Sequence, residues 1–540
     1  MSAAQRKLAL IVVDSLDTAM LERAVAEGVA PTFKRLVDRG TLIRDCVSTF
    51  PSVTPVACSE IATGVGPERH WISGMNWYHR VERRYVEYGS SFEATRTFGL
   101  FRTLYDTVYN MNMAHLSPEV ETIFERAGDA GVRTACTPFL IYRGRTRHEL
   151  GLEGLMRRMA MAAKFHHAVW GPDELFYGEL YASRKVPCRP TLARPGTRDE
   201  YSACVGRELV EQALYDLMLF SLPDNDYHSH RYGPDAQVDS IAHADDCFGS
   251  MVETAGGIDS FLDDHAVILL ADHSQSAVEQ RLPLAEALEE EWRVLRPNAD
   301  RPEEAELAVS PIARAGAVYV LEEGRRHARA HARVRKRLRE LSGIDVVTWL
   351  AAPDGAPVER RGTGPPPGED LEAVVERAGA ELRFRPGSGV EDLLGREWEL
   401  DGDAAVLGEV RDGHFTSDAY PDALGRLWTA LVAPHAGDVL VSLADRYECV
   451  DWGDATHVGG GSHGSLHRDD SLGPLLMVGL DQAVEPREQW TLRDVSALVL
   501  EHFGVGGPVV HEGGRQPAIP LEEGREPATP LAELPNDSVR

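Results

Sequence analysis

The stretch that decides the fold is "LMLFSLPDNDYHSHRYGPDA", Leu217–Ala236, in which an apolar run ends directly before a cluster of acidic and histidine side chains. Similar short runs recur along the chain, separated by longer amphipathic stretches: "LALIVV", "RTACTPF", "AVILLA", "DVLVSL" and "PLLMVG". Continuous apolar strands that alternate with helices indicate a mostly parallel sheet with helices on both faces. The sequence therefore predicts an α/β fold, in which ligands bind beyond the carboxyl ends of the strands.

The length of 540 residues predicts more than one folding unit, since single cores rarely grow past roughly 300 residues. We expect residues 1–310 to form the first part of the core, with a helical insert at about 145–198 that lacks a clear strand. A smaller α+β insertion is expected over residues 311–410, and the core is completed over 411–505. Residues 506–540 are rich in Gly, Pro and Glu without periodicity, which is typical of an extended or disordered tail.

The formal net charge of -29 makes a nucleic-acid polymer an unexpected partner, because such a surface repels phosphates. A small phosphate-bearing substrate would need local positive charge, which a bound metal ion supplies. The basic stretch "RRHARAHARVRKRLREL" is flanked by Glu322, Glu323 and Glu340, so we interpret it as a solvated helix face rather than a nucleic-acid patch.

The sequence contains no apolar run near the ~18 residues needed to span a membrane, and we expect no membrane association. The run "LALIVV" is too short for the apolar part of a signal peptide. Seven cysteines without regular spacing argue against a disulfide framework and for a reducing compartment. These features together predict a cytoplasmic protein.

Five short stretches place reactive side chains at a strand's end or in the loop that follows it. Asp14 follows "LALIVV", where a helix cap or turn residue is the alternative. The cluster in the opening stretch combines carboxylates and imidazoles, which suit zinc or another divalent transition ion. Asp272 and His273 end "LLADHSQS", and His463 lies in the glycine-rich "GGGSHGSLHRDD", whose His467 we expect at the surface.

The fifth stretch is "FPSVTPVAC", in which Thr54 precedes Pro55. Thr54 could be a helix cap, with Pro55 at the first helical position. A helix N-terminus also attracts an anion, so the same position suits a hydroxyl nucleophile for a phosphate group. The other stretches supply enough ligands for two ions that could clamp a phosphoryl centre: Asp14, Asp272, His273, His463 and an Asp-x-x-x-His pair, which is either Asp224 with His228 or Asp226 with His230.

This ordered series resembles the alkaline phosphatase superfamily, specifically its nucleotide pyrophosphatase/phosphodiesterase branch. The resemblance covers residues 8–78, 215–276 and 421–479, and it implies an alkaline phosphatase-like catalytic core with two divalent ions, most consistent with Zn²⁺. It implies these ligands: Asp14, Thr54, Asp272 and His273 for one ion, and Asp226, His230 and His463 for the other.

The register of one family motif has to be chosen between two possibilities. The element "D-x-x-G-H-x-x-G-P" fits Asp226 and His230, because the downstream Gly-Pro then stays in place, whereas Asp224 and His228 do not preserve it. Serines replace two family glycines, in "HSH" and "DHS". In "HWISGMNWY", methionine occupies the position of the family's phosphoryl-binding asparagine, and Asn76 follows one residue later as the candidate for that role.

The resemblance implies a zinc-dependent hydrolase that cleaves phosphodiester or pyrophosphate bonds through a phospho-threonine on Thr54. The sulfatase signature "C-x-P-x-R" is absent around Thr54. The alternatives are a phosphonoacetate-type phosphonate hydrolase and a non-catalytic metal-binding scaffold. The expected substrate is a small phosphodiester or nucleotide, and "RRYVEYGSSFEATRTFGLF" could contact its base or phosphate, or could be an ordinary packed loop.

Overall fold

The computed structural model describes residues 5–152, 158, 167–178, 180–188, 198–299, 301–362 and 364–507. All the quoted apolar runs except "DVLVSL" contribute to a core sheet whose strands follow the order β2-β25-β11-β1-β10-β5-β8-β9. Its strands are β1 (Lys7–Val13), β2 (Thr41–Val47), β5 (Thr134–Cys136), β8 (Glu174–Tyr177), β9 (Tyr181–Ala182), β10 (Leu217–Leu222), β11 (His265–Leu270) and β25 (Leu472–Val478). Strand β1 pairs in parallel with β10 and β11, whereas β25 runs antiparallel to β11 and β2.

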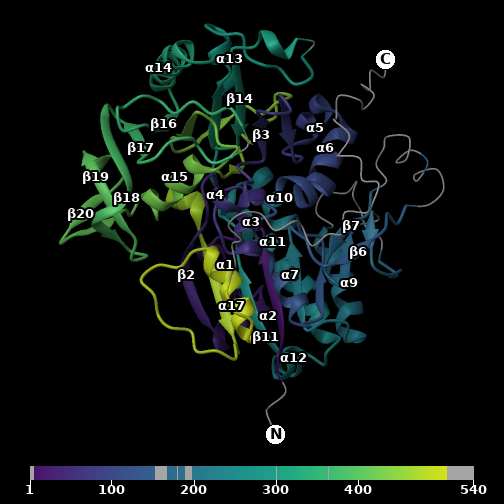
Figure 1. Ribbon diagram of the computed structural model, residues 1–540. Helices are drawn as coiled ribbons and strands as arrows, with labels where there is room; N and C mark the ends of the chain where they lie inside the picture. The colour runs from purple at the N-terminus through teal and green to yellow at the C-terminus, as the bar shows by residue number, and fades with distance from the viewer. Residues whose placement is uncertain are drawn as a thin grey trace.

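Helices cover both faces of this sheet, which confirms the predicted α/β architecture (Figure 1). Side chains alternate along β1, so that Leu8, Leu10 and Val12 join one buried cluster and the intervening residues join another. The first face packs against α3 (Thr54–Thr63), α7 (Ile123–Asp129) and α17 (Arg493–His502). The second packs against α1 (Thr18–Glu27), α2 (Pro31–Arg39), α9 (Arg198–Glu211), α11 (Gln237–Glu253) and α12 (Ile258–Asp264).

A second, mostly antiparallel sheet lies beside the core, toward the upper left of Figure 1. Its strands are β14 (Leu307–Ile312), β15 (Ala315–Val320), β16 (Ile344–Ala351), β17 (Glu372–Arg377), β18 (Ala380–Asp392), β19 (Glu397–Gly402), β20 (Glu409–Arg411), β21 (His414–Thr416) and β22 (Val439–Leu443). Strand β22 comes from the run "DVLVSL" and lies between β15 and β16, so the chain beyond residue 410 contributes to the centre of this sheet.

The basic stretch forms α14 (Arg325–Glu340), which packs on β16 through buried side chains that include Val334 and Leu338. Its outer arginines contact acidic side chains: Arg333 lies 2.9 Å from Glu291, and Arg339 lies 2.6 Å from Glu376. These ion pairs fit the interpretation of a solvated helix face.

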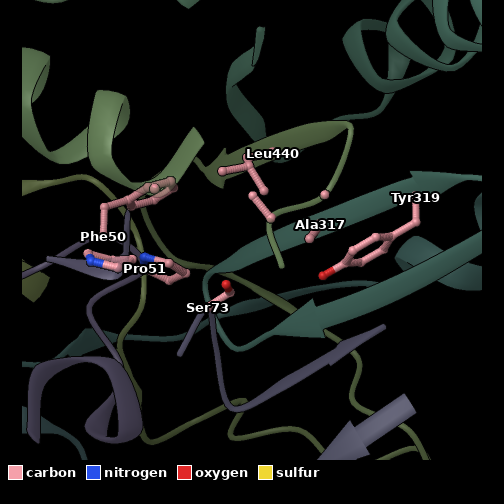
Figure 2. Close-up of a pocket in the computed structure, with 10 residues that line it drawn as sticks. Phe50, Pro51, Ser73, Ala317, Tyr319 and Leu440 are labelled. Carbon is pink, nitrogen blue, oxygen red and sulfur yellow. The ribbon is translucent and has the colours of Figure 1, made fainter. Parts of the chain in front are cut away.

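A small, mainly apolar pocket lies between the loop before α3 and the second sheet (Figure 2). Among its lining residues are Phe50 and Pro51, from the loop before α3, and Ala317, Tyr319 and Leu440, from β15 and β22. One hydrophobic cluster continues across this contact from the core into the second sheet. The loop that leads to Thr54 is therefore packed against both sheets.

Shorter elements complete the architecture. They are α4 (Pro67–His70), β3 (Asn76–His79), β4 (Arg84–Glu87), α5 (Phe92–Phe98), α6 (Leu100–Tyr105), a π-helix (Asp106–His115), β6 (Thr146–His148), β7 (Val169–Gly171), α10 (Asp224–Tyr232), β12 (Ser276–Ala277), β13 (Gln280–Leu282), α13 (Leu284–Glu289), α15 (Ala423–Val432), β23 (Tyr447–Cys449), β24 (Gly461–Ser462) and α16 (Arg468–Ser471). Three 3₁₀ turns span Pro234–Ala236, Pro302–Glu304 and Ala404–Val406.

One expectation about the insert at 145–198 is corrected, and another falls outside the described residues. Its described part contains strands β6 to β9, and β8 joins the core sheet beside β5, although no strand was expected there. Strands of two to four residues are too short to produce a recognisable period. The expected helical portion falls largely on residues 153–157 and 159–166, outside the described residues, and most of the expected tail, 508–540, lies outside them too.

A disulfide joins Cys188 to Cys204 in α9, which the irregular cysteine spacing did not indicate. The other five cysteines are buried and free. This bond removes the cysteine-based argument for a reducing compartment, and the cytoplasmic location stays a prediction. None of the helices in the described ranges is long and apolar enough to cross a membrane.

Candidate active site

The strand register brings three of the predicted stretches to one edge of the core sheet. Val13 pairs with Leu222 and Val12 with Leu270, so β1, β10 and β11 end together. Asp14 follows β1 and its N–H donates to the carbonyl of Leu222 at 3.1 Å. Asp272 and His273 follow β11, and α10, which carries Asp226 and His230, follows β10. The site thus lies beyond the carboxyl ends of the parallel strands, as the sequence predicts.

Asp14, Asp272 and His273 form a candidate metal-ligand group, which we call the first ligand group, with one possible ligand atom of each lying within 4.8 Å of the others. His273 Nε2 is 3.4 Å from Asp272 Oδ2 and 3.8 Å from Asp14 Oδ1. Both of these carboxylate oxygens are buried without a hydrogen-bond partner in the described part of the chain. Unpartnered buried carboxylate oxygens are costly, and a bound cation would satisfy them, so the group fits a metal ion.

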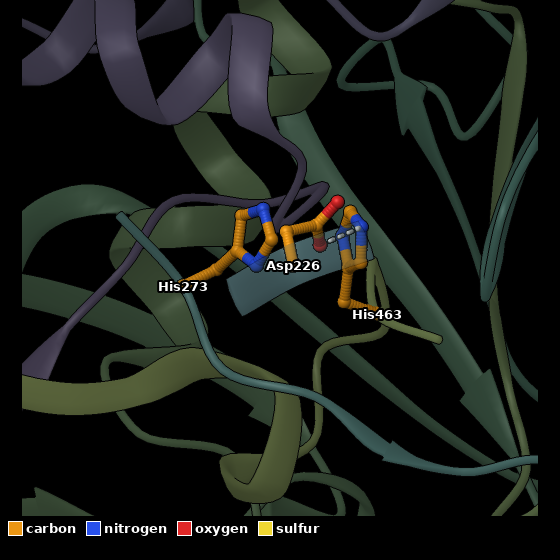
Figure 3. Close-up of side chains that lie close together, drawn as sticks. All are labelled: Asp226, His273 and His463. Atoms are coloured by element: carbon orange, nitrogen blue, oxygen red, sulfur yellow. Dashed lines mark ion pairs between the residues drawn. The ribbon is translucent and has the colours of Figure 1, made fainter. Parts of the chain in front are cut away.

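The second ligand group centres on Asp226, which α10 positions one turn before His230. Asp226 Oδ1 lies 3.4 Å from His230 Nε2. It also lies 3.6 Å from His463 Nε2, and Figure 3 shows Asp226 between His273 and His463. The rings of His273 and His463 stack with centroids 3.8 Å apart, and Asp226, His273 and His463 also form a group within 4.8 Å. The two groups therefore adjoin through His273 and could hold two neighbouring ions.

Backbone carbonyls orient all three histidines in the same way. A carbonyl only accepts hydrogen bonds, so the ring nitrogen facing it must carry the proton. Nδ1 of His230 faces Gly461 O at 2.8 Å, Nδ1 of His463 faces Ser52 O at 2.8 Å, and Nδ1 of His273 faces Ser274 O at 3.1 Å. Nε2 is then left with a free lone pair pointing at the carboxylates, which is the arrangement of a metal-ligating histidine.

Burial sets the protonation of the site. It lowers the pKa of each ligand histidine to about 4, so all three are neutral at pH 7: His230, His273 and His463. Burial also raises the pKa of Asp272 to about 6, and burial together with the neighbouring carboxylates raises that of Asp14. Burial opposes ionisation of Asp226 as well, but the three histidines hold its pKa below the usual range. Neutral imidazoles next to closely spaced carboxylates favour the binding of a cation.

Thr54 is the first residue of α3, and the interpretation of Thr54 as a helix cap is wrong. Val53 occupies the cap position with extended backbone angles, and no side chain caps this helix in the described structure. The Thr54 hydroxyl instead lies 3.2 Å from His273 Nε2. At the first helical position its N–H has no carbonyl one turn earlier to accept it. Both groups are therefore available at the first ligand group.

Glycines allow the loop before His463 to contact α10 closely. A Cβ atom on Gly460 would lie 2.0 Å from the carbonyl oxygen of His230, and one on Gly461 would lie 2.6 Å from Gln275 Oε1. No side chain fits at such distances. The glycine-rich sequence thus permits the approach that places His463 beside His230.

Ser15 and Gln275 are site residues that sequence reasoning missed. Ser15 is fully buried, with a left-handed φ of 58°, and its hydroxyl donates to Asp226 Oδ1 at 2.7 Å. Its N–H donates to Asp272 Oδ1 at 3.1 Å, so it links the two ligand groups. Gln275 Nε2 donates to Asp226 Oδ1 at 2.6 Å. Their only sequence signal is that each lies within two residues of a predicted ligand, Asp14 or His273.

A second missed pair supports His230. The ring of His457 stacks on that of His230 with centroids 4.0 Å apart, and His457 Nδ1 lies 2.7 Å from Glu448 Oε1. Burial tends to lower the pKa of His457. The hydrogen bond and charge of Glu448 have a larger effect in the opposite direction, so the pKa of His457 lies above its ordinary value. Ser462 also donates to Glu448 Oε1 at 2.7 Å. The pair fixes one face of a ligand histidine.

The remaining candidates lie elsewhere. Asn76 is fully buried and donates through Nδ2 to Pro311 O at 2.6 Å; its phosphoryl-binding role stays a prediction. Asp224 faces α9, where its Oδ2 accepts from the N–H of Asp199 at 2.9 Å. His228 Nε2 lies 3.1 Å from Ala236 O. His467 lies at the start of α16 with its side chain 35% exposed, consistent with the expected surface position.

Comparisons with known proteins show the same fold in solved structures. Among solved structures, the murine ectonucleotide pyrophosphatase/phosphodiesterase 5 superposes with a TM-score of 0.54 at 10% identity, covering 93% of this chain and 96% of that chain. An inactive variant of the murine protein, with a threonine replaced by alanine and AMP bound, gives 0.53 at 10% identity and the same coverage. Phosphonoacetate hydrolase from Sinorhizobium meliloti 1021, in complex with phosphonoformate, gives 0.52 at 16% identity, again covering 93% and 96%. At these identities the likeness shows the shared fold.

The sequence itself carries the family assignment. No curated protein matches it significantly. The profile of the type I phosphodiesterase / nucleotide pyrophosphatase family, however, matches residues 8–361, which is more than half of the chain. The chain belongs to this family of metal-dependent phosphoester hydrolases, within the alkaline phosphatase superfamily.

Proposed function

We propose that the protein hydrolyses phosphodiester or pyrophosphate bonds through a covalent phospho-threonine on Thr54, at a site for two divalent metal ions. The observation that carries the proposal is the Thr54 hydroxyl, 3.2 Å from His273 Nε2 and not used to cap its helix. It lies next to a ligand group whose carboxylates have unpartnered oxygens among the described residues.

The donor set fits two ions. Asp14, Thr54, Asp272 and His273 would hold one ion, and Asp226, His230 and His463 the other. Imidazole nitrogens combined with carboxylate oxygens suit zinc. When bound, such ions supply Lewis-acid stabilisation of phosphoryl charge and lower the pKa of a coordinated hydroxyl.

The chain's own groups then account for the reaction. The Thr54 oxygen, having released its proton to water, forms a bond to phosphorus while the bond to the leaving oxygen breaks. The free N–H of Thr54, at the start of a ten-residue helix, can donate to a non-bridging phosphoryl oxygen. Water then cleaves the phospho-threonine and restores the hydroxyl. No separate general base is required, because the site itself acidifies the nucleophile.

Two substrate classes follow from the relatives. The murine phosphodiesterase structure with AMP supports a nucleotide or another small phosphodiester. The similarity to phosphonoacetate hydrolase supports a phosphonate as the second candidate. A phosphodiester is the primary proposal because the family profile is that of phosphodiesterases.

Substitution of Thr54 tests the proposal. Thr54→Ala should abolish hydrolysis of bis-p-nitrophenyl phosphate, and Thr54→Ser should retain part of it. Thr63→Ala is the matched control, because Thr63 is a buried threonine at the other end of α3 whose hydroxyl bonds only the Ser59 carbonyl in the described structure. Mass spectrometry of acid-quenched wild type should locate phosphate on Thr54.

Three results would contradict parts of this scheme. Wild-type turnover by Thr54→Ala would exclude Thr54 as the nucleophile, and purified protein without stoichiometric zinc would exclude the zinc-dependent mechanism. Cleavage of phosphonoacetate with no activity on the diester would select the phosphonate hydrolase.

A further inference from the structure

A second cluster of metal-ligand side chains lies outside the active site, where α9, α10 and α11 meet. Asp199 is at the start of α9, Asp224 at the start of α10, and His243 in the middle of α11. One possible ligand atom of each lies within 4.8 Å of the others. Asp199 is 0% exposed and Asp224 is 4% exposed, so two carboxylates are buried against each other.

Each of the two carboxylates accepts a hydrogen bond at only one of its two oxygens, and the donor is the backbone N–H of the other residue. The N–H of Asp199 donates to Asp224 Oδ2 at 2.9 Å, and the N–H of Asp224 donates to Asp199 Oδ1 at 3.0 Å. This reciprocal contact ties the two helix starts together. The remaining oxygens, Asp199 Oδ2 and Asp224 Oδ1, are buried and accept no hydrogen bond within the described ranges. An unpartnered buried carboxylate oxygen requires a cation or a proton.

The nearby guanidinium does not meet this requirement. Arg198 Nε lies 3.8 Å from Asp224 Oδ1, beyond hydrogen-bond distance, and its side chain is 52% exposed. Such an exposed pair is screened by solvent and compensates little of a buried charge.

Helix α11 supplies the ligand types that a transition metal needs. His243 presents its imidazole to the two carboxylates, and the Cys247 thiol lies one turn later, 3.7 Å from His243 Nε2. Cys247 is 6% exposed and free. Two carboxylate oxygens and an imidazole nitrogen form a donor set that suits Zn²⁺.

We propose that Asp199, Asp224 and His243 bind a Zn²⁺ ion with a structural role. The site is separate from the active site because Asp224 faces α9, whereas Asp226, two residues later, faces His230 and His463. The ion would fasten the start of α10 to α9 and α11. It would thereby hold the helix that presents Asp226 and His230, whatever reaction these residues serve.

Metal analysis of the full-length protein tests the site. His243 is only partly buried, so His243→Ala should fold and should contain about one equivalent of zinc less than the wild type after gel filtration. Asp199→Asn, which keeps the acceptor for the Asp224 N–H, should lose the same equivalent. The His463→Ala variant should lose active-site zinc and keep this ion. The result is a difference between variants, so it does not depend on how many ions the active site holds.

Thermal unfolding with and without added zinc distinguishes the ion from a proton shared by the carboxylates. If zinc binds, the zinc-dependent rise in Tm at this site is lost in Asp199→Asn and His243→Ala. If a proton bridges the pair, Asp199→Asn substitutes a neutral amide for the neutral carboxyl group, the zinc content does not change, and the Tm equals or exceeds that of the wild type. Equal zinc content in wild type, His243→Ala and Asp199→Asn would overturn the proposal.

Discussion

Replacing Ser15 by alanine removes one hydroxyl from the centre of the active site while keeping the Cβ atom. That hydroxyl donates to Asp226 Oδ1 at 2.7 Å and lies 3.1 Å from His273 Nδ1, so it contacts one member of each ligand group. Ser15 is fully buried, and water cannot simply take its place. We expect Ser15→Ala to loosen Asp226 without removing any metal ligand.

The magnitude follows from the kind of hydrogen bond that is lost. A hydrogen bond to a charged acceptor contributes about 1.5–3 kcal/mol. Since about 1.4 kcal/mol corresponds to a factor of ten in affinity, the loss would weaken zinc binding roughly 10–100-fold. Gln275 Nε2 still donates to the same oxygen at 2.6 Å, so we expect the lower end, about tenfold.

Competition with a chromophoric zinc chelator measures this affinity, and kcat at saturating zinc shows whether positioning is also lost. Ser274→Ala is the control, because Ser274 is an equally buried serine whose hydroxyl contacts Asp17 at 3.4 Å rather than a ligand. We expect zinc affinity to fall in Ser15→Ala and to stay unchanged in Ser274→Ala. Wild-type zinc affinity in Ser15→Ala would refute the view that this hydroxyl orients Asp226.

Three further changes have expected outcomes. Arg314→Met leaves Asp470 as a buried charge without its ion-pair partner at 2.6 Å, so the free energy of unfolding measured in urea should fall by about 3–5 kcal/mol; a loss below about 1 kcal/mol would contradict this. Gly460→Ala drives a methyl group into the His230 carbonyl and should lower both zinc content and turnover, whereas unchanged values would mean that the loop can move away. Burial lowers the pKa of His70 to about 3, so between pH 6.5 and 3 the unfolded state binds the extra proton and stability falls on acidification. Going from pH 7 to 5 should cost the wild type about 2 kcal/mol through this residue, a loss that His70→Asn should not show in urea titrations at the two pH values.

The apolar runs and their order along the chain predicted the fold class, because an apolar run is a local signal of burial. Strands β1, β10 and β11 follow from continuous β-branched and aliphatic sequence, and ligands beyond their carboxyl ends follow from the parallel sheet they form. The strands of the insert at 145–198 were harder to predict from the sequence, because strands such as β6 and β9 have only two or three residues and are defined by their pairing partners. Strand β22 is as apolar as β10, and only the pairing with β15 and β16 assigns it to the second sheet.

Residue chemistry and spacing by themselves indicated the α/β class and the stretches that carry candidate metal ligands, because those depend on composition and on the positions of strand ends. The resemblance to a family motif was needed to prefer Asp226 and His230 over Asp224 and His228. The tertiary structure decided what each side chain does. It replaced the capping role of Thr54 with a contact to His273, and it placed Asp226 and His230 at the site while Asp224 turned toward Asp199. It also brought in Ser15, Gln275 and the Glu448–His457 pair. These contacts join residues far apart in sequence, so their geometry exists only once the strands and loops have packed.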